Sequence, residues 1–324
     1  RGSMTGNDRP MRPLETADFA RLAVLQNAVN SAAGWHMVTS AEELEDEISA
    51  PYVSLPSDGR CIEADGVLVG YVHTYMVDST ERELRCHVFG GVHPDHRRRG
   101  HGTALLGWGV ARALEQLGSN PLGLPTAVRV ESMAGDSATE ALLASHGFVP
   151  VRWFNDLRLA LTAAPHLAPP AGVTVAPWDP GRGEELRTVK NDAFRDHWGS
   201  TPTSIEGWAQ MTGGFGARPD LSFMALEGER IVGLLLSHRY PDDDAVIGGR
   251  YGWVDKIATL RSHRGRGIAT ALLGAAIGAY AREGLTHAAL NVDTGNPTGA
   301  FGLYTRLGFE PFRGAVTHEL TRAG

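Results

Sequence analysis

The residues with the clearest chemical potential lie in a turn directly before the apolar segment that begins at Ile268. This turn contains Arg261, Arg264, Gly265, Arg266 and Gly267. Glycine lets the backbone adopt positive φ and approach a ligand closely, and the first N–H groups of a helix have no partner inside the helix. Such a turn favours an anion, and phosphate in particular. The alternative is an ordinary strand-to-helix turn with surface arginines, because short glycine motifs also arise by chance.

The same order of residues occurs twice along the chain. Arg264 and Gly267 repeat Arg97 and Gly100 at a spacing of 167 residues. Further on, a Gly-Phe pair recurs at a spacing of 161 residues. Two long-range coincidences of nearly equal period indicate an internal duplication whose unit has the size of a domain. The sequence therefore predicts two copies of one α/β unit.

Neither copy fits the other common phosphate-binding motifs. A dinucleotide-binding turn has a third glycine three residues after its second, and these positions hold Thr270 and Leu105. The sequence contains no Gly-Lys-Ser or Gly-Lys-Thr, which excludes a P-loop. The turn therefore belongs to another class of phosphate site.

Both copies resemble the Arg/Gln-x-x-Gly-x-Gly/Ala motif of the GNAT N-acetyltransferase superfamily. The matching stretches are Arg97-x-x-Gly100-x-Gly102 and Arg264-x-x-Gly267-x-Ala269. A second landmark of the superfamily is matched by Leu303-Tyr304-x-x-Leu307-Gly308-Phe309. In that superfamily the turn holds the pyrophosphate of acetyl-coenzyme A (acetyl-CoA), so the resemblance implies acetyl-CoA as the acyl donor. The two-domain layout is similar to that of the mycothiol synthases.

The resemblance also implies which residues bind the coenzyme. In both copies they comprise the end of the strand that leads into the turn, the turn itself and the first turn of the helix. In the second copy they are Ile257, Ala258, Thr259, Arg264, Gly265, Arg266, Gly267, Ile268, Ala269 and Thr270, together with Asn296. In the first copy they are Gly91, Val92, Arg97, Arg98, Arg99, Gly100, His101, Gly102 and Thr103.

Acetyl transfer to an amine also needs a proton for the departing thiolate. A tyrosine can supply it, because its phenol, with a pKa of about 10, carries a proton at neutral pH. Tyr304 is the candidate, since it falls on the tyrosine of the superfamily's second landmark. The alternative is a half-buried aromatic that packs a helix on a sheet. Leu143 stands at the matching position of the first copy and cannot donate a proton, which predicts that the first copy is catalytically degenerate.

Asp255 is the candidate general base that would help to deprotonate the acceptor amine. It lies on the strand that feeds the second turn, and strand alternation would place it on one face with Trp253, Ile257 and Thr259. A surface aspartate paired with the neighbouring lysine is the alternative. Two further residues of the second copy, Glu310 and His238, are weaker candidates for the same role.

Composition limits the class of protein. The chain has 324 residues, 42% of them apolar, which is enough for two domains with full cores. Its net charge of −7 disfavours nucleic acid as a partner in spite of the run Arg97-Arg98-Arg99. Cys61 and Cys86 are too few for a zinc site or a disulfide framework, so no metal is expected. No apolar run is long enough to span a membrane, and a cytoplasmic enzyme is the expectation.

The expected fold is α/β (α+β), with two tandem GNAT domains. Each would have a mixed, mostly antiparallel central sheet flanked by helices. The stretch from 162 to 172 is rich in proline and alanine and lacks periodicity, which is typical of a linker. The predicted domains are therefore residues 4–161, degenerate, and residues 173–324, active, with the linker between them.

These features predict an N-acetyltransferase that acts in its C-terminal domain on a primary amine of a small molecule. One alternative is a non-catalytic protein that binds acyl-CoA in both halves and regulates. Another is a protein or peptide acetyltransferase, which would need an open groove. Acceptor recognition is expected from the helix pair after the first strand of the second copy, with Trp198 and Trp208 as candidate apolar walls.

Overall fold

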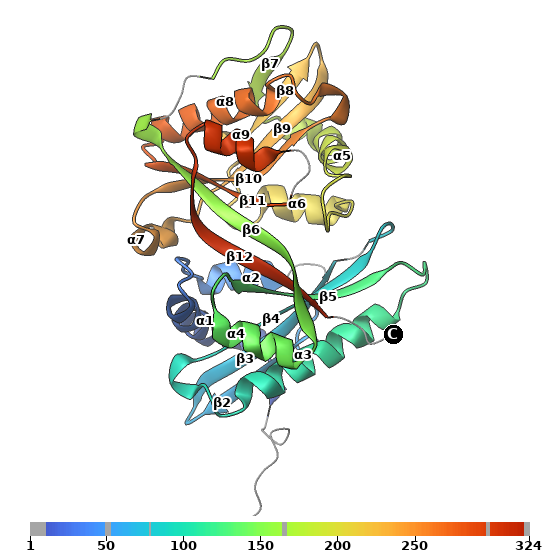
Figure 1. Ribbon diagram of the computed structural model, residues 1–324, viewed down its shortest axis with the longest axis vertical. Helices are drawn as coiled ribbons and strands as arrows, with labels where there is room; N and C mark the ends of the chain where they lie inside the picture. Colours follow the sequence, from blue (N-terminus) through green and yellow to red (C-terminus); the bar gives the residue numbers. More distant parts are fainter. Residues whose placement is uncertain (1–10, 49–52, 78, 164–166, 296–298, 321–324) are drawn as a thin grey trace, which may run out of the picture. The chain divides into compact units, whose positions relative to one another are not determined.

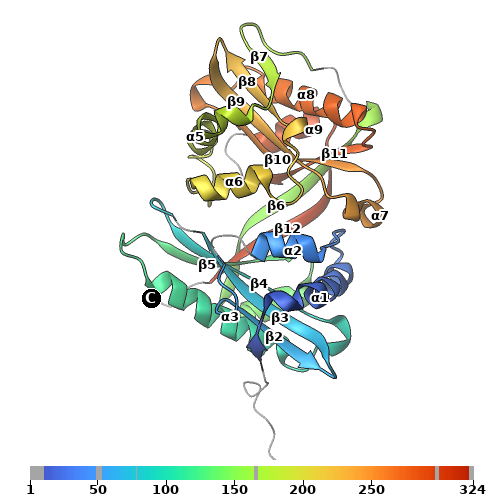
Figure 2. The same ribbon diagram turned by 180° about the vertical axis from the view of Figure 1, so that it is seen from behind.

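The computed structural model describes residues 11–48, 53–77, 79–163, 167–295 and 299–320. The chain divides into two compact units, and Figures 1 and 2 show their helices and strands from two sides. The first unit contains the chain as far as Trp153 together with the stretch from Ala315 onward. The second unit contains Phe154–Gly314.

The first unit is a sheet with helices on both faces. Its strand order is β1-β2-β3-β4-β5-β12, and of these neighbouring pairs, as far as the described residues show, only β4 and β5 are parallel. Two apolar cores form, one beneath α3 and one beneath α1 and α2. The strands are β1 (Arg12–Pro13), β2 (Gly59–Ala64), β3 (Val67–Val77), β4 (Leu84–Val92), β5 (Thr126–Met133) and the end of β12 (Glu310–Leu320). The helices are α1 (Phe19–Ala33), α2 (Ala41–Ile48), α3 (His101–Gly118) and α4 (Ser137–Ser145).

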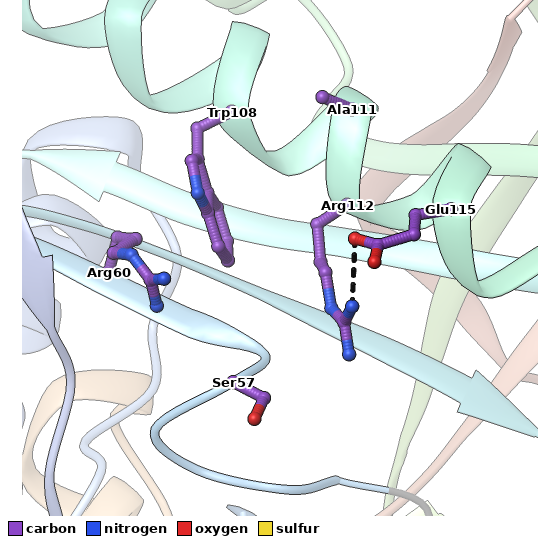
Figure 3. A pocket seen from close by; sticks show the side chains of 6 residues that line it. All are labelled: Ser57, Arg60, Trp108, Ala111, Arg112 and Glu115. Carbon is purple, nitrogen blue, oxygen red and sulfur yellow. Dashed lines mark hydrogen bonds and ion pairs between the residues drawn. The ribbon is translucent and has the colours of Figure 1, made fainter.

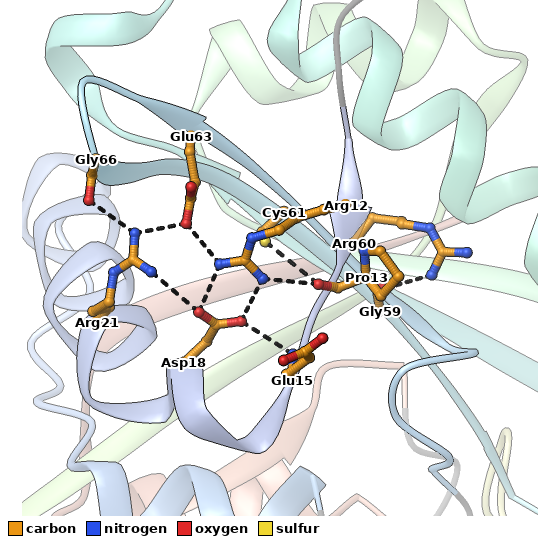
Figure 4. Close-up of polar contacts among 10 residues, drawn as sticks. All are labelled: Arg12, Pro13, Glu15, Asp18, Arg21, Gly59, Arg60, Cys61, Glu63 and Gly66. Atoms are coloured by element: carbon orange, nitrogen blue, oxygen red, sulfur yellow. Dashed lines mark hydrogen bonds and ion pairs between the residues drawn. The ribbon is translucent and has the colours of Figure 1, made fainter.

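Local sequence signals explain the start of this unit. An Asp-Gly turn joins β2 to β3, with φ of 52° at Asp65 and 78° at Gly66. An ion-pair network ties β1 to α1 and to the same hairpin (Figure 4). In it the Arg12 guanidinium donates to Asp18 Oδ2 at 2.7 Å and to Glu63 Oε1 at 2.6 Å.

The second unit repeats the plan. Its strand order is β6-β11-β10-β9-β8-β7, and among the neighbouring pairs described in this unit only β10 and β11 are parallel. The strands are the end of β6 (Phe148–Ala160), β7 (Thr174–Pro177), β8 (Phe223–Glu227), β9 (Arg230–His238), β10 (Tyr251–Thr259) and β11 (His287–Asp293). The helices are α5 (Gly183–Ala193), α6 (Ile205–Gly213), α7 (Asp244–Ile247), α8 (Ile268–Arg282) and α9 (Ala300–Arg306). Periodicity did not predict the four-residue helix α7.

The two units exchange strands, which the predicted ranges 4–161 and 173–324 did not include. Residues 154–160 of β6 pair with β11 in the second unit, and residues 315–319 of β12 pair with β5 in the first. Residues 310–320 form a single strand. The physical reason is that alternation identifies a strand but does not identify the strand with which it pairs.

Each unit has a parallel strand pair that ends early. β4 pairs with β5 only from Leu84 to His87, and β10 pairs with β11 only from Tyr251 to Val254. The later residues of β4 and β10 stay paired on their other edge, with β3 and β9. Each ladder thus stops before the strand reaches its turn, which leaves one strand edge available to a ligand's amide groups.

Candidate active site and coenzyme-binding turns

The second turn has the backbone conformation that its sequence predicts. Gly265 has φ of 75° and Gly267 has φ of 83°, both in the left-handed region. No atom lies within 4 Å of the position that a Cβ would take at either glycine, so the backbone conformation, and not crowding, requires glycine there. Gly267 directly precedes α8, whose 15 residues align the peptide dipoles toward the turn. The turn is therefore built to receive an anion.

Carboxylates hold the arginines of the second turn. Arg264 Nη1 lies 3.0 Å from Asp196 Oδ2, and Arg264 Nη2 donates to the Ala193 carbonyl at 2.8 Å. Arg266 Nη2 lies 2.8 Å from Glu227 Oε1. The hydrogen bond from Arg264 lowers the pKa of Asp196, so this carboxyl stays ionised at neutral pH. A phosphate at this turn would share these arginines with the carboxylates or displace them.

The first turn has the same backbone but different arginine partners. Gly100, which precedes the 18-residue α3, has φ of 82°. Arg97 Nε donates to the Val92 carbonyl at 3.3 Å, and Arg99 Nη2 donates to the Asp95 carbonyl at 3.0 Å. Within the described residues, the arginines from 97 to 99 form no ion pair with a carboxylate. Their positive charge is therefore more available to a phosphate than that of the second turn.

The other predicted coenzyme residues lie on the elements expected of them. Ile257, Ala258 and Thr259 end β10 and pair through their other edge with Leu235, Leu234 and Gly233. The predicted residues 268–270 and 101–103 form the first turns of α8 and α3. Asn296 lies outside the described residues. The Thr259 hydroxyl is buried and has no hydrogen-bond partner within the described part of the chain, which fits a coenzyme that supplies one there.

Tyr304 lies on α9 in the core of the second unit. It is 6% exposed and meets the Phe309 ring edge-on, with 6.0 Å between the ring centroids. Burial raises the pKa of Tyr304 to about 12, so the phenol keeps its proton at neutral pH. Leu143 holds the corresponding place on α4 and is fully buried in the first unit's core. The two units therefore differ at this position as the sequence predicts.

Asp255 stands at a β-bulge that the sequence did not predict. Val254 lies opposite Ser237 and Lys256 lies opposite Leu236, so Asp255 is an extra residue in the ladder. Because of the bulge, the prediction that Ile257 and Thr259 share a face of the sheet with Asp255 is wrong. Gly233, which pairs with Thr259, faces α8, since a Cβ there would lie 3.1 Å from Ile268.

The bulge turns the Asp255 carboxylate toward the opposite face. Its Oδ2 lies 3.9 Å from Nδ1 of His238, a residue that pairs with Trp253 on the neighbouring strand. Lys256 Nζ lies 3.1 Å from each carboxylate oxygen. Burial acts to raise the pKa of Asp255, but Lys256 and His238 outweigh it and the pKa is lowered. β4 has no such bulge, because its pairing with β3 runs without interruption from Gly70 to Val77.

One buried ion pair of the second unit joins parts of the chain that sequence spacing could not connect. Arg313 of β12 pairs with the buried Asp156 of β6, with 2.5 Å between Nη2 and Oδ2. Its guanidinium lies 5.7 Å from the Trp253 ring and 5.5 Å from the Phe312 ring. Only the exchange of strands brings this group together. No local motif in the sequence signals it.

The two tryptophans predicted as acceptor walls differ in position. Trp208 is 6% exposed and packs beside Trp178 in the core, so it forms no wall of an open site. Trp198 is half-buried, and its ring lies 6.4 Å from that of Phe154. Trp198 alone therefore stays a candidate for acceptor contact.

A pocket in the first unit involves neither turn (Figure 3). It has a volume of about 340 Å³ and is lined by Ser57, Arg60, Trp108, Ala111, Arg112 and Glu115. Arg60 lies 4.5 Å from the Trp108 ring centroid, and Arg112 donates to the buried Asp58 at 2.9 Å. Both arginines already have partners in the protein, so their positions in this pocket are explained without a ligand.

The described residues contain neither a metal-binding cluster nor a membrane-spanning helix. No three His, Cys, Asp or Glu side chains there are grouped so that they could hold a metal ion. None of the helices described combines the length and the apolar character needed to cross a bilayer.

Comparison with known proteins identifies the family. The model of the acetyltransferase (GNAT) family matches twice, at residues 22–148 and 183–309. These two matches cover most of the chain, and each contains one copy of the turn. The chain belongs to the GNAT acetyltransferase family. It is therefore an acyl-CoA-dependent N-acetyltransferase, with two tandem GNAT domains.

The relatives of this GNAT protein agree in length and layout. It is 30% identical to the mycothiol acetyltransferase of Salinispora arenicola, over 98% of this chain and 96% of the relative. It is also 30% identical to that of Thermomonospora curvata, over 79% and 80%. A GCN5-related N-acetyltransferase from Sphaerobacter thermophilus matches with a TM-score of 0.75 and 28% identity, over 96% of this chain and 94% of that one. A tandem GNAT protein from the clavulanic acid biosynthesis pathway shares the fold, with a TM-score of 0.69 and 18% identity.

Proposed function

We propose that this GNAT protein transfers acetyl from acetyl-CoA to a primary amine of a small molecule, and that its second unit performs the reaction. The observation that carries the proposal is the combination found only in the second unit. There a glycine turn, a buried phenol at Tyr304 and a carboxylate at Asp255 belong to one sheet and its helices. The first unit keeps the turn and has a leucine and an unbulged strand instead.

The residues of the second unit fit the donor. The Gly265 and Gly267 turn would hold the pyrophosphate through backbone N–H groups at the start of α8. The free edge of β10 near Thr259 would accept the amide groups of the pantetheine arm. Acetyl-CoA supplies the acetyl group as a thioester when bound. The arginines of the turn add charge that complements the phosphates.

The acceptor must lose a proton before it can attack. An amine with a pKa near 10.4 is almost wholly protonated at pH 7, and reaching the neutral form costs roughly 4 to 5 kcal/mol. Asp255 remains ionised, because Lys256 and His238 lower its pKa. It therefore serves as the anion that receives the ammonium group. A negative charge at this position favours a cationic amine over a neutral alcohol.

Tyr304 completes the reaction on the leaving-group side. Its phenol keeps the proton at neutral pH because burial raises its pKa to about 12. A departing thiolate takes this proton, and the negative charge passes to the phenolate. The phenol is then restored by the proton that the newly formed amide nitrogen releases.

The relatives suggest the first acceptor to test. Several proteins that resemble this chain over most of their length bear the name mycothiol acetyltransferase. The amine that those enzymes acetylate is therefore the first acceptor to assay, followed by a panel of small primary amines and by peptides. We expect free thiol to form from acetyl-CoA with a small amine and not with peptides. Thiol release with peptides alone would overturn the proposed acceptor class.

A second role concerns the first unit. Its turn has Gly100 in the left-handed conformation and three arginines without carboxylate partners among the described residues. With Leu143 in place of a proton donor, this unit is proposed to bind acetyl-CoA without turnover. Calorimetry with acetyl-CoA should then find two sites on each chain.

A further inference from the structure

His238 is a buried histidine that lies beside Asp255. It ends β9, pairs with Trp253 of β10 and is 7% exposed. Its ring lies parallel to that of Tyr240, with 6.1 Å between the ring centroids and an interplanar angle of 6°. The side chain is thus fixed in direction on the face toward which the bulge turns the Asp255 carboxylate.

One nitrogen of the His238 ring has no partner in the protein. Nδ1 is buried and has no hydrogen-bond partner within the described residues. A neutral imidazole carries its proton on one nitrogen, and the other nitrogen is a hydrogen-bond acceptor. We assign the proton to Nε2. Nδ1 then presents a bare lone pair.

Two hydrogen-bond acceptors therefore face each other with no proton between them. Nδ1 of His238 and Oδ2 of Asp255 are 3.9 Å apart. This separation is too long for a direct hydrogen bond, and a group with two or more N–H bonds can donate to both atoms. An ammonium group has three such bonds. The pair is therefore complementary to the protonated form of an amine.

We propose that His238 Nδ1 takes the proton from the acceptor's ammonium group, and that Asp255 holds first that ammonium and then the imidazolium. This inference rests on the proposed function of the second unit. Burial lowers the pKa of His238, although Asp255 partly opposes it, so the ring is neutral at pH 7 and able to accept a proton. Asp255 is less suited to that step, because its own pKa is lowered and Lys256 holds both of its oxygens.

The proton balance of the step is complete. One N–H proton passes from the ammonium nitrogen to Nδ1, and the freed lone pair forms the C–N bond to the thioester carbonyl carbon. The C–S bond breaks, and the sulfur receives the proton of the Tyr304 phenol. The nitrogen gives its second proton to the phenolate, which restores Tyr304. His238 then releases its proton to water, so acetyl-CoA and an ammonium yield an amide, a thiol and one proton.

The first test is the substitution His238→Gln, which lacks a titratable base but retains a polar side chain that can donate and accept hydrogen bonds. We expect kcat to fall by about 100-fold or more, as for the loss of a general base, while acetyl-CoA affinity stays within about twofold. The acidic limb of the kcat profile against pH should disappear. His287→Gln is the matched control, because His287 is a partly exposed histidine of the same unit, on β11, with no part in the proposed step.

The second test is Asp255→Asn, which separates His238 from Asp255 as the group that titrates. The charges that face this pair are Asp255 and Lys256 on β10 and Lys190 on α5. Asp255 raises the pKa of His238, so its neutralisation should shift the acidic limb of kcat to lower pH. Disappearance of the limb in Asp255→Asn, or its persistence in His238→Gln, would overturn the inference. A wild-type protein without turnover on any amine would instead refute the proposed function.

Discussion

The two glycine turns have the same backbone conformation, but their arginines have different partners. Gly100 and Gly267 adopt almost the same φ, 82° and 83°, and each directly precedes a long helix. In the second unit, Asp196 and Glu227 pair with the arginines of the turn, whereas the first turn's arginines contact backbone carbonyls. The comparison teaches that the local motif sets the backbone conformation of the turn. In the second unit, the carboxylates that pair with the arginines of the turn come from distant parts of the sequence.

The same comparison separates the features that we propose bind the coenzyme from the groups that we propose transfer protons. Both units keep the early end of the parallel strand pair. Only the second adds the bulge at Asp255 and a phenol at Tyr304 in place of Leu143. The two copies therefore share the backbone of the turn and differ at the residues that we propose transfer protons.

The largest expected effect comes from blocking the second turn. Gly267→Glu would put a side chain at φ of 83° and a negative charge where the phosphate binds, so we expect thiol release to fall below about 1% of wild type. A continuous thiol assay measures it. Circular dichroism and the melting temperature should show that the variant is folded. Activity near the wild-type level would mean that the first unit is the working one.

Removal of the Tyr304 hydroxyl is the next test. Tyr304→Phe should lower kcat by tenfold or more, because the departing sulfur loses its proton donor, with little change in the affinity for acetyl-CoA. The matched control is Tyr280→Phe, which removes a buried hydroxyl bonded to Ser237 at 2.6 Å. That control should cost about 1 kcal/mol of stability and leave kcat unchanged. Equal kcat values in Tyr304→Phe and wild type would exclude Tyr304 from the mechanism.

A smaller effect is expected in the alkaline pH range. Burial raises the pKa of Tyr304 to about 12, so its acid form is lost only as the pH rises through that value. The kcat at saturating amine should therefore stay level up to about pH 10. A descending limb near pH 9 that vanishes in Tyr304→Phe would show that the phenol titrates much lower.

The smallest effect concerns the carboxylates around the second turn. Asp196→Asn removes a negative charge paired with Arg264, so acetyl-CoA affinity of the second unit should rise about two- to fivefold at low salt and less at high salt. Asp192→Asn is the control, because Asp192 pairs with Arg195 and not with the turn. Calorimetry on both variants makes the comparison. A loss of affinity in Asp196→Asn would show that this carboxylate supports the turn instead of competing with phosphate.

Much of the fold followed from local patterns. Glycine spacing located both turns, and the long helices after them begin where the sequence predicts. Repetition of the motif revealed the duplication, which the two family matches confirm. These features depend on residues that are close together in the sequence, which is why the sequence alone predicts them.

The parts that escaped prediction depend on pairing between distant strands. The bulge at Asp255 is defined by the register of β10 against β9. The alternation of apolar and polar residues along β10 alone does not indicate it. The exchange of β6 and β12, which brings Arg313 to Asp156, is set by which strand each one joins. The partners of the arginines, Asp196 and Glu227, also come from other segments of the second unit.

The most direct measurement is the turnover number of Gly100→Glu, the counterpart of Gly267→Glu in the first turn. Calorimetry should first establish that this variant has lost one acetyl-CoA site. The account predicts that its kcat for thiol release then equals that of the wild type, because the second unit carries out the reaction. A loss of kcat as large as that of Gly267→Glu would contradict the assignment of the chemistry to the second unit.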